Sequence, residues 1–135
     1  MADTTVAISD EASIVAARQS ARTFARDLGF GLVDQSRIAT AVSELTRNVV
    51  RYATEGRGMV TLRTLAAPDR GPGLEIVVSD DGPGIADLDA ALREGFSSGR
   101  GMGLGLPGTQ RLMDEMLIDS GPGRGTIVTI RKWRR

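Results

Sequence analysis

The chain has 135 residues, enough for one domain with a substantial buried core, and it carries 17 basic against 17 acidic residues. This balance argues against binding of nucleic acid through a broad basic surface, and the absence of cysteine and histidine excludes disulfides, thiol nucleophiles, the usual zinc ligands, histidine-dependent triads and autophosphorylation on histidine. No apolar run has membrane-spanning length and the first residues lack the layout of a signal peptide, so we expect a cytoplasmic protein that binds no membrane.

The first part of the chain predicts one strand and two helices. Residues 4–9 alternate and are β-branched, which favours a short strand. A helix capped by Asp10 or Ser9 follows, since apolar residues recur there at helical spacing until Gly29, which suits a left-handed C-terminal turn. A second amphipathic helix is predicted over residues 34–53.

Glu44 and Asn48 lie four residues apart on a flank of this second helix. A carboxylate and a carboxamide therefore project side by side, one turn from each other. Such a pair suits a site that handles a proton and a metal ion. The alternative is that both residues merely solvate the outer face of an ordinary helix, because matched polar pairs on helices are common.

The middle of the chain predicts two strands joined as a hairpin. Residues 54–58 are rich in turn formers, and β-favouring runs follow at residues 59–65 and 74–79, with a Pro/Gly loop between them. Asp80 follows this second run directly, and the glycine-rich segment 81–85 comes after it. A strand that ends in a carboxylate before glycines delivers an acceptor to the sheet edge and allows close approach of a ligand, although an ordinary turn has the same composition.

The next segment predicts an anion site. A short helix is expected over residues 87–94, and residues 95–105 contain five glycines and few side chains that pack. This glycine-rich segment opens a helix expected over residues 106–115, with Pro107 in its first turn. Free N–H groups and the helix dipole favour phosphate there, and the alternative is a disordered surface loop.

Three familiar kinds of phosphate-handling protein are excluded, one by the context of its motif and two because their motifs are absent. The spacing Gly-x-Gly-x-x-Gly begins at Gly103, but it does not leave a strand directly, and Asp119 comes too early to bind a ribose. A Gly-x-x-x-x-Gly-Lys-Ser/Thr loop is absent, which excludes P-loop chemistry. Without His-Arg-Asp or Asp-Phe-Gly segments, the chain is not a eukaryotic-type protein kinase.

The last part predicts a second hairpin, formed by strands at residues 117–120 and 127–131 around a glycine-rich turn. Thr126 begins the final strand with a hydroxyl free to meet a ligand, unless it is an ordinary strand threonine. The basic residues 131–135 are interpreted as the solvated end of that strand.

The order of these motifs resembles the GHKL ATP-binding family of gyrase, Hsp90, histidine kinases and MutL: Glu-x-x-x-Asn on a helix, Asp-x-Gly-x-Gly after a strand, a glycine-rich lid that opens a helix, and Gly-Thr before a closing strand. The resemblance covers nearly the whole chain and implies one ATP-binding domain over residues 1–135. It implies an α+β two-layer sandwich, in which a mixed, mainly antiparallel sheet of about five strands is covered on one face by about three helices.

Within that family, the small size and the absent histidine resemble the branch of anti-sigma factors and switch kinases. Segments 14–19, 28–31, 33–35, 43–48 and 105–115 are similar to RsbT-like serine kinases of the bacterial stressosome. Anti-sigma relatives of the RsbW and SpoIIAB type usually carry a histidine soon after the motif asparagine. This chain has Arg-Tyr in that neighbourhood, which favours the RsbT side.

The resemblance also implies roles for individual residues. Asp80 accepts a hydrogen bond from the adenine amino group, Gly82 and Gly84 let the chain pass close to the base, and Asn48 holds Mg²⁺. Glu44 is the base for the attacking hydroxyl or the group that orients it. The other residues expected to bind ATP are Ile85, Arg100, Gly101, Met102, Gly103, Leu104, Gly105 and Thr126.

The implied activity is an ATP-dependent serine/threonine kinase that phosphorylates a STAS-domain antagonist of the RsbS or RsbR type. The kinase then acts as a partner switch and activates a PP2C-type phosphatase of the RsbU type, which leads to control of a sigma factor. One alternative is an anti-sigma factor that sequesters a sigma subunit and phosphorylates its antagonist. The other is a regulator that binds nucleotide without transfer.

Overall fold

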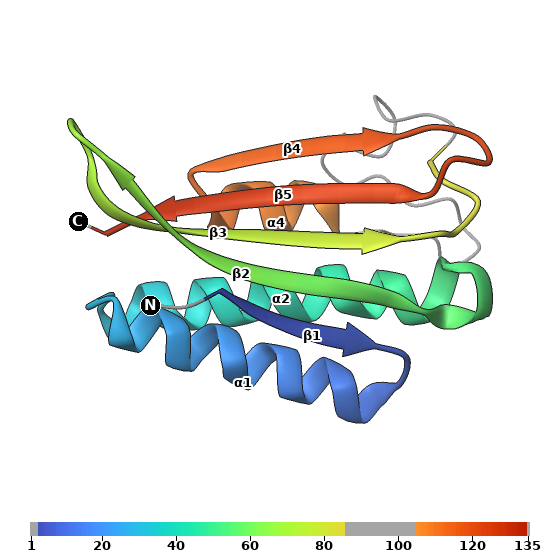
Figure 1. Ribbon diagram of the computed structural model, residues 1–135, viewed down its shortest axis with the longest axis horizontal. Coiled ribbons are helices and arrows are strands. Elements are labelled where there is room, and N and C mark those ends of the chain that lie inside the picture. Colours follow the sequence, from blue (N-terminus) through green and yellow to red (C-terminus); the bar gives the residue numbers. More distant parts are fainter. Residues whose placement is uncertain (1–2, 86–104, 135) are drawn as a thin grey trace.

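The computed structural model describes residues 3–85 and 105–134, in which three α-helices cover one face of a five-stranded sheet (Figure 1). The expected α+β two-layer sandwich is confirmed. The helix expected over residues 87–94 and most of the glycine-rich segment lie outside the described residues. The elements are β1 (Thr4–Ile8), α1 (Glu11–Asp27), α2 (Leu32–Tyr52), the 3₁₀ turn η1 (Thr54–Gly56), β2 (Gly58–Ala67), β3 (Gly71–Asp80), α4 (Leu106–Leu112), β4 (Glu115–Ser120) and β5 (Thr126–Trp133).

The sheet has the strand order β1-β2-β3-β5-β4, and all of these pairings are antiparallel. Both predicted hairpins are present, one between β2 and β3 and one between β4 and β5. The pairing of β3 with β5 sets Asp80 opposite Thr126, and the pairing of β2 with β3 sets Gly58 opposite Asp80. Two motifs that are far apart in the sequence therefore meet at one end of the sheet.

The core lies between the helices and the sheet. Alternate residues of the central strands point toward the helices because side chains alternate between the faces of a strand. Burying each such aliphatic side chain contributes about 1.5–3 kcal/mol. The buried apolar residues of this layer include Ile14, Ala17, Ala21, Phe24, Ile38, Ala41, Val42, Leu45, Val49, Val60, Leu62, Leu74, Ile76, Val78, Val128 and Ile130.

The start of α1 matches the expectation, while the start of α2 does not. Asp10 caps α1 and forms a capping box with Ser13. The second helix begins at Leu32, two residues before the predicted start, with Gly31 as its cap. Its first turn was missed because Leu32 and Val33 are 76% and 64% exposed, so they do not belong to the buried stripe that reveals the rest of the helix.

The end of α4 was also predicted wrongly. This helix ends at Leu112, and β4 begins at Glu115, a residue that the sequence pattern assigned to the helix. Asp114 lies where the chain changes from helix to sheet: its N–H donates to the Arg131 carbonyl at 3.0 Å, and its carboxylate accepts from the Trp133 N–H at 2.8 Å. Pairing with β5 therefore ends the helix.

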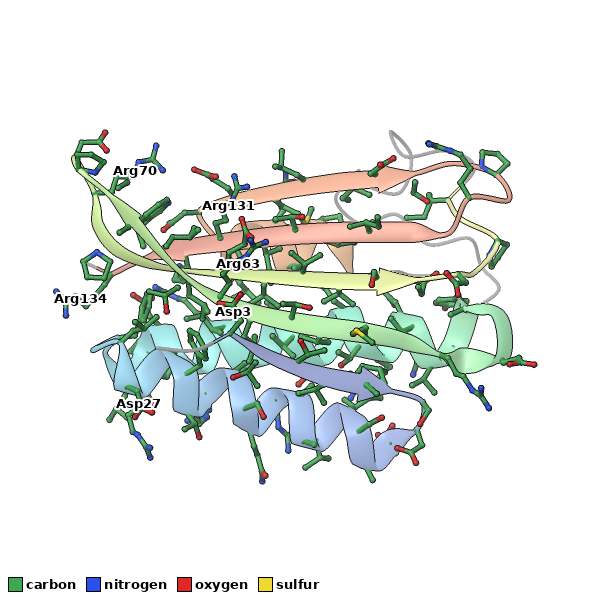
Figure 2. The ribbon with its side chains drawn as sticks, viewed as in Figure 1. Asp3, Asp27, Arg63, Arg70, Arg131 and Arg134 are labelled. Carbon is green, nitrogen blue, oxygen red and sulfur yellow. The ribbon has the colours of Figure 1, made fainter. Side chains whose placement is uncertain are left out.

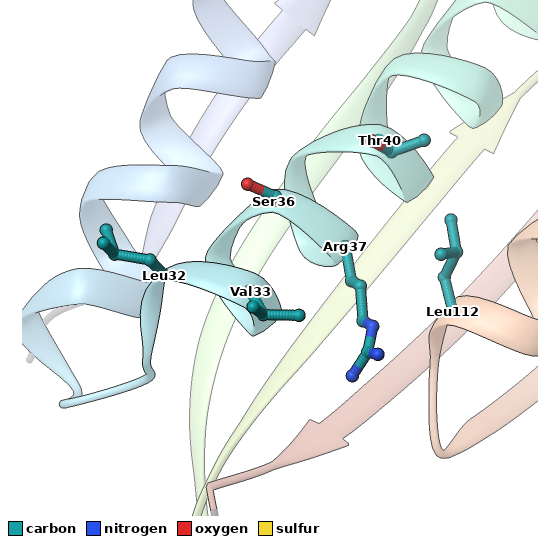
Figure 3. A pocket seen from close by; sticks show the side chains of 6 residues that line it. All are labelled: Leu32, Val33, Ser36, Arg37, Thr40 and Leu112. Carbon is teal, nitrogen blue, oxygen red and sulfur yellow. The ribbon is translucent and has the colours of Figure 1, made fainter.

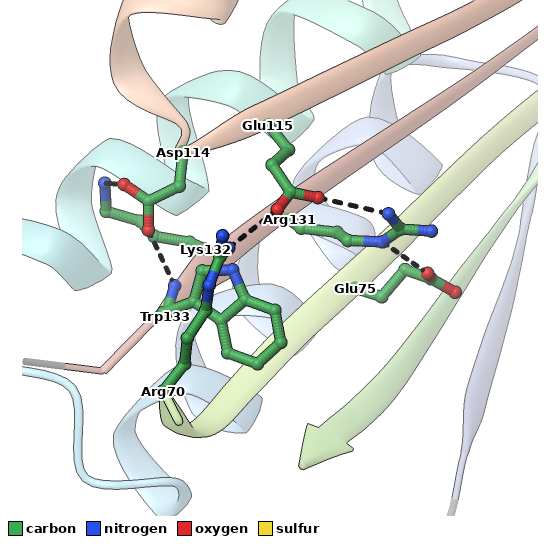
Figure 4. A network of polar contacts seen from close by, with 7 residues as sticks. All are labelled: Arg70, Glu75, Asp114, Glu115, Arg131, Lys132 and Trp133. Carbon is green, nitrogen blue, oxygen red and sulfur yellow. Dashed lines mark hydrogen bonds and ion pairs between the residues drawn. The ribbon is translucent and has the colours of Figure 1, made fainter. Parts of the chain in front are cut away.

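The basic end of the chain is not the solvated strand end that the sequence suggested. Lys132 is 4% exposed, and its Nζ donates to the Leu112 carbonyl at 2.8 Å and lies 3.8 Å from Asp34 Oδ1. The same Nζ lies 4.0 Å from Asp114 Oδ1 (Figure 4). Arg131 lies beside Arg63 on the sheet (Figure 2), and both bind the buried Glu75, each at 2.8 Å. The tail thus joins β5 to both layers of the domain.

No helix in the described part of the chain has both the length and the apolar character needed to cross a membrane.

Candidate functional site

One face of α2 carries Glu44, Asn48 and Tyr52, which are separated by four residues each and therefore lie in a row. The buried residues of the same helix, such as Leu45 and Val49, face the core instead. All three side chains of the row are partly exposed. The row extends about 12 Å along the helix axis, at 1.5 Å per residue.

The Glu44 end of this row lies against the start of α4. Gly105 is the N-terminal cap of α4 and has a φ of 66°, in the left-handed region where glycine is favoured. A Cβ atom at Gly105 would lie 2.8 Å from Glu44 Oε2, so the backbone approaches the carboxylate too closely for a side chain. Pro107 occupies the first turn of α4, as predicted.

Arg47 is a neighbour of Glu44 that the sequence analysis did not include in the site. Its Nη1 lies 3.4 Å from Glu44 Oε1, and the side chains are 31% and 42% exposed. An ion pair this long and this exposed holds a carboxylate only weakly. Glu44 can therefore turn toward a hydroxyl group that comes close to it.

The Tyr52 end of the row lies close to the segment that follows β3. Asp80 Oδ1 accepts a hydrogen bond from the Gly82 N–H at 2.7 Å. A Cβ atom on Gly82 would lie 2.7 Å from Ala53 Cα and 3.0 Å from the Tyr52 carbonyl oxygen. The contact with the end of α2 therefore leaves no room for a side chain at residue 82. The same contact brings Asp80 close to the Tyr52 end of the row.

Burial raises the pKa of Asp80 above its ordinary value, and the negative charge of Asp81 acts in the same direction. The Gly82 N–H, and to a smaller degree the Thr126 N–H, oppose this rise because they donate to the charged carboxylate. Two backbone donors leave unused lone pairs on a carboxylate, which has about four acceptor positions. Asp80 is therefore suited to accept a further N–H from a ligand.

Ser120 connects the segment after β3 to the final strand, although the sequence gave no reason to single it out. Its Oγ accepts from the Ile85 N–H at 2.7 Å, donates to the Gly125 carbonyl at 2.9 Å and lies 2.9 Å from Thr126 Oγ1. The Thr126 hydroxyl, which was expected to be free for a ligand, therefore has a protein partner. Since the single Ser120 proton is donated to Gly125, Thr126 donates its own proton to Ser120.

Gly84 is close to protein backbone. It has a φ of 80°, and a Cβ atom there would collide with the Gly121 carbonyl in the turn between β4 and β5. The Gly123 N–H also donates to the Pro83 carbonyl at 2.7 Å. These contacts account for the second glycine of Asp-x-Gly-x-Gly without a ligand, and they fix the position of Ile85.

The expected site residues thus form two groups joined by α2. Glu44 and Gly105 meet at the start of α4, and Asn48 lies one turn further along α2. The residues at the end of the sheet are Asp80, Gly82, Ile85 and Thr126. Five further expected residues lie outside the described part of the chain, namely Arg100, Gly101, Met102, Gly103 and Leu104.

The donor set suits a metal ion that arrives with a phosphate ligand. Within residues 3–85 and 105–134 there is no cluster of three or more acidic side chains that would bind a metal by itself. The carboxamide oxygen of Asn48 is the type of hard ligand that Mg²⁺ accepts, and Mg²⁺ usually takes few protein ligands beside water and phosphate oxygens. The residues present therefore fit Mg²⁺ bound together with a nucleotide.

Comparison with known proteins gives a consistent result. Residues 33–135 match the family described as histidine kinase-, DNA gyrase B-, and HSP90-like ATPase. The chain is 50% identical over 131 residues to serine/threonine-protein kinase RsbT of Bacillus subtilis, covering 96% of each protein. It is 32% identical to an anti-sigma F factor of Caldanaerobacter subterraneus, over 87% of this chain and 82% of that protein. The SiaB-SiaC complex from Pseudomonas aeruginosa contains a chain with the same fold, with a TM-score of 0.59 at 16% identity over 98% of this chain and 89% of that one.

Proposed function

Because this chain belongs to the histidine kinase-, DNA gyrase B- and HSP90-like ATPase family, we propose that its residues 1–135 form a single ATP-binding domain that acts as a partner-switching serine/threonine kinase. The observation that carries this proposal is the row on α2. At one end of the row, Asp80 offers a hydrogen-bond acceptor for a nucleotide base. At the other end, the Glu44 carboxylate lies beside Gly105. A nucleotide that lies along this row has its base at Asp80 and its phosphates between Asn48 and Gly105.

Asp80 selects adenine. Its carboxylate accepts the hydrogen bond of the adenine amino group, whereas guanine presents a carbonyl oxygen at that position and would face an acceptor with an acceptor. The N–H groups of Gly82 and Thr126 keep the carboxylate oriented for this contact. Ile85 and Thr126 complete the base end of the site.

Asn48 would hold the Mg²⁺ ion that accompanies ATP, and bound there it would neutralise charge on the phosphates. Gly105 contributes backbone at the phosphate end, as do Gly101 and Gly103 of the preceding segment. Met102 and Leu104 lie between these glycines in the sequence, and Arg100 adds a positive charge.

Glu44 accepts the proton of the attacking serine or threonine hydroxyl. The new bond forms between that oxygen and the γ-phosphorus, the bond from this phosphorus to the β–γ bridging oxygen breaks, and ADP leaves with the electron pair. Because the ion pair with Arg47 is long and exposed, the Glu44 carboxylate can turn toward this hydroxyl. Placement of the two reactants and neutralisation of charge supply most of the rate, since phosphoryl transfer needs little covalent help.

The acceptor is a STAS-domain antagonist of the RsbS or RsbR type. A phosphate on its docking surface brings repulsion and a desolvation cost, so the phosphorylated antagonist leaves the kinase. The released kinase then activates a PP2C-type phosphatase of the RsbU type, and this step leads to control of a sigma factor. The 50% identity to RsbT supports this assignment.

Phosphotransfer from radiolabelled ATP to the STAS proteins encoded beside this chain tests the proposal. We expect label on a serine or threonine of at least one STAS protein and a loss of its affinity for the kinase after transfer. ATP binding without any labelled STAS protein would contradict the kinase assignment.

Anti-sigma activity is the second candidate, since an anti-sigma F factor is 32% identical to this chain. In that case the protein sequesters a sigma subunit and phosphorylates the antagonist of that complex. Affinity capture with purified sigma factors and STAS proteins separates the two functions, because only an anti-sigma factor retains a sigma subunit in the presence of ATP.

A further inference from the structure

A groove lies between the N-terminal half of α2 and the end of α4 (Figure 3). Val33 and Thr40 on α2 point toward Leu112 on α4, and the Arg37 side chain extends between Val33 and Leu112. We call this surface the α2–α4 groove. Its lining residues are Leu32, Val33, Ser36, Arg37, Thr40 and Leu112.

The α2–α4 groove continues into the proposed site of transfer. Val33, Arg37, Thr40 and Glu44 follow each other at intervals of three or four residues, so they share one face of α2. Thr40 is one turn, or about 6 Å, from Glu44, and Val33 is about 16 Å from it along the axis. A protein that binds in the groove therefore also covers the part of α2 that carries the Glu44 carboxylate.

The outer part of this groove has the apolar side chains that a docking surface needs. Leu32 and Val33 are 76% and 64% exposed, more than any other large hydrophobic residue in the described part of the chain. Both lie in the first turn of α2, where a polar residue would serve the helix equally well. Apolar side chains grouped at the mouth of a groove mark an interaction surface.

The charges beside the groove select the partner. Arg37 lines the groove, and Arg22 donates to Ser36 Oγ at 3.3 Å on its α1 side. The Asp34 carboxylate lies 3.0 Å from Arg37 and 3.8 Å from Lys132, so these two cations share its single negative charge. The contact of Arg22 is with the neutral Ser36 hydroxyl. The rim therefore has an excess of positive charge, which is complementary to an acidic surface.

We propose that the α2–α4 groove is the docking site of the acceptor protein, which inserts an apolar side chain between Val33 and Leu112 and places acidic groups at Arg37 and Arg22. The inference rests on the proposed kinase function, because it takes continuity with Glu44 as the reason that the occupant is the acceptor. Docking there holds the acceptor hydroxyl near Glu44 and the γ-phosphate. It does not involve the residues of the ATP site.

Steady-state transfer to the STAS protein that the wild-type chain phosphorylates tests this docking site. We expect Val33→Asp to raise the KM for the acceptor about tenfold, as for the loss of one central apolar contact. Arg37→Glu raises the same KM and weakens its dependence on salt, because repulsion replaces attraction. Calorimetric affinity for ATP is unchanged in both variants. An aspartate in the first turn of α2 favours the helix, so Val33→Asp folds.

Two variants outside the α2–α4 groove serve as matched controls. Leu117 is 55% exposed on β4, and Arg124 is 64% exposed in the turn that follows it. Leu117→Asp and Arg124→Glu make the same chemical changes as the groove variants and leave the KM for the acceptor at its wild-type value.

The outcomes separate the two proposals. If wild-type protein transfers phosphate and Val33→Asp does not change the KM, the groove assignment is wrong and the kinase assignment stands. A change in sedimentation of Val33→Asp at constant KM would assign the groove to a second copy of the chain and also overturn the inference. If wild-type protein binds ATP and labels no STAS protein, both proposals fall.

Discussion

Gly105 and Glu44 approach so closely that a side chain on the glycine would meet the carboxylate, with its Cβ 2.8 Å from Glu44 Oε2. This contact joins the start of α4 to the centre of α2, the two elements between which transfer is proposed. The atom that a new Cβ would meet is at the end of a flexible side chain, so a larger residue would displace the carboxylate and leave the backbone of α2 in place.

Gly105→Ala is expected to slow phosphotransfer more than it weakens ATP binding, since it moves the proposed base away from the acceptor. The φ of 66° adds a cost of about 1–2 kcal/mol in unfolding free energy for an L-residue in the left-handed region. Single-turnover transfer and chemical denaturation measure the two effects. Transfer at the wild-type rate would contradict the role given to the Gly105–Glu44 contact.

Gly108→Ala is the control for this substitution, because it makes the same change one turn later in α4. A Cβ at Gly108 has its nearest neighbour, Arg111 Nη2, at 3.9 Å, which is an ordinary contact. Alanine inside a helix stabilises by about 0.5–1 kcal/mol relative to glycine. We expect this variant to retain transfer and to unfold at a slightly higher denaturant concentration.

Asp80→Asn is expected to weaken ATP binding about a hundredfold or more. The carboxylate accepts backbone N–H groups from Gly82 and Thr126, and asparagine offers one acceptor oxygen where the carboxylate offers two. Its NH₂ group would then face a donor, either from the backbone or from the adenine. Calorimetry with Mg-ATP measures the loss, and unchanged affinity would refute the adenine assignment.

Glu44→Ala provides the opposite pattern in the same two assays. Removal of the base leaves the adenine contact intact, so we expect ATP affinity within about twofold of wild type and a loss of transfer by about a factor of 10²–10⁴. A variant that loses ATP binding would show instead that Glu44 supports the nucleotide and not the hydroxyl.

The parts of the site that the sequence could predict are those built from local spacing. Glu44 and Asn48 share a face because they are four residues apart on one helix, and no other part of the chain is needed to place them. The meeting of Asp80 with Thr126 depends on the pairing of β3 with β5, which only the order of family motifs suggested. Ser120 was missed because its three partners come together only in the folded sheet.

The same distinction explains the errors in the fold. The buried stripe revealed most of α2, but its exposed first turn at Leu32 and Val33 left no periodic signal. Local sequence also extended α4 through Glu115, whereas pairing of that residue with Arg131 of β5 placed it in a strand. In both cases a contact with solvent or with a distant strand, and not local propensity, determined the boundary.

Lys132→Met is expected to lower the unfolding free energy by about 2–4 kcal/mol, although it keeps most of the side-chain volume. The change leaves the Leu112 carbonyl without its 2.8 Å donor and removes the positive charge near Asp34 and Asp114. Urea denaturation measures this loss. The control is Arg124→Met, whose ion pair with Asp119 is long and exposed, and it should change stability by less than about 0.5 kcal/mol.

Glu115→Gln tests the ion network on the open face of the sheet through its dependence on pH. Hydrogen bonds from Arg131 at 3.1 Å and from Arg70 at 2.8 Å hold the pKa of Glu115 below its ordinary value of 4.5. A carboxyl group whose pKa is lowered on folding stabilises the protein above its unfolded pKa, and this contribution is lost as the pH falls through the folded pKa.

Melting temperatures of wild-type protein and Glu115→Gln should therefore differ at pH 7, with the wild type higher, and the difference should shrink as the pH falls below 4.5. Glutamine cannot ionise, so its own stability lacks this contribution at every pH. Asp119→Asn is the control, because that carboxylate is 71% exposed and its substitution should have little effect at pH 7. A difference between wild type and Glu115→Gln that stays constant from pH 7 to pH 3 would mean that the network stabilises the sheet by packing of the side chains and not by charge.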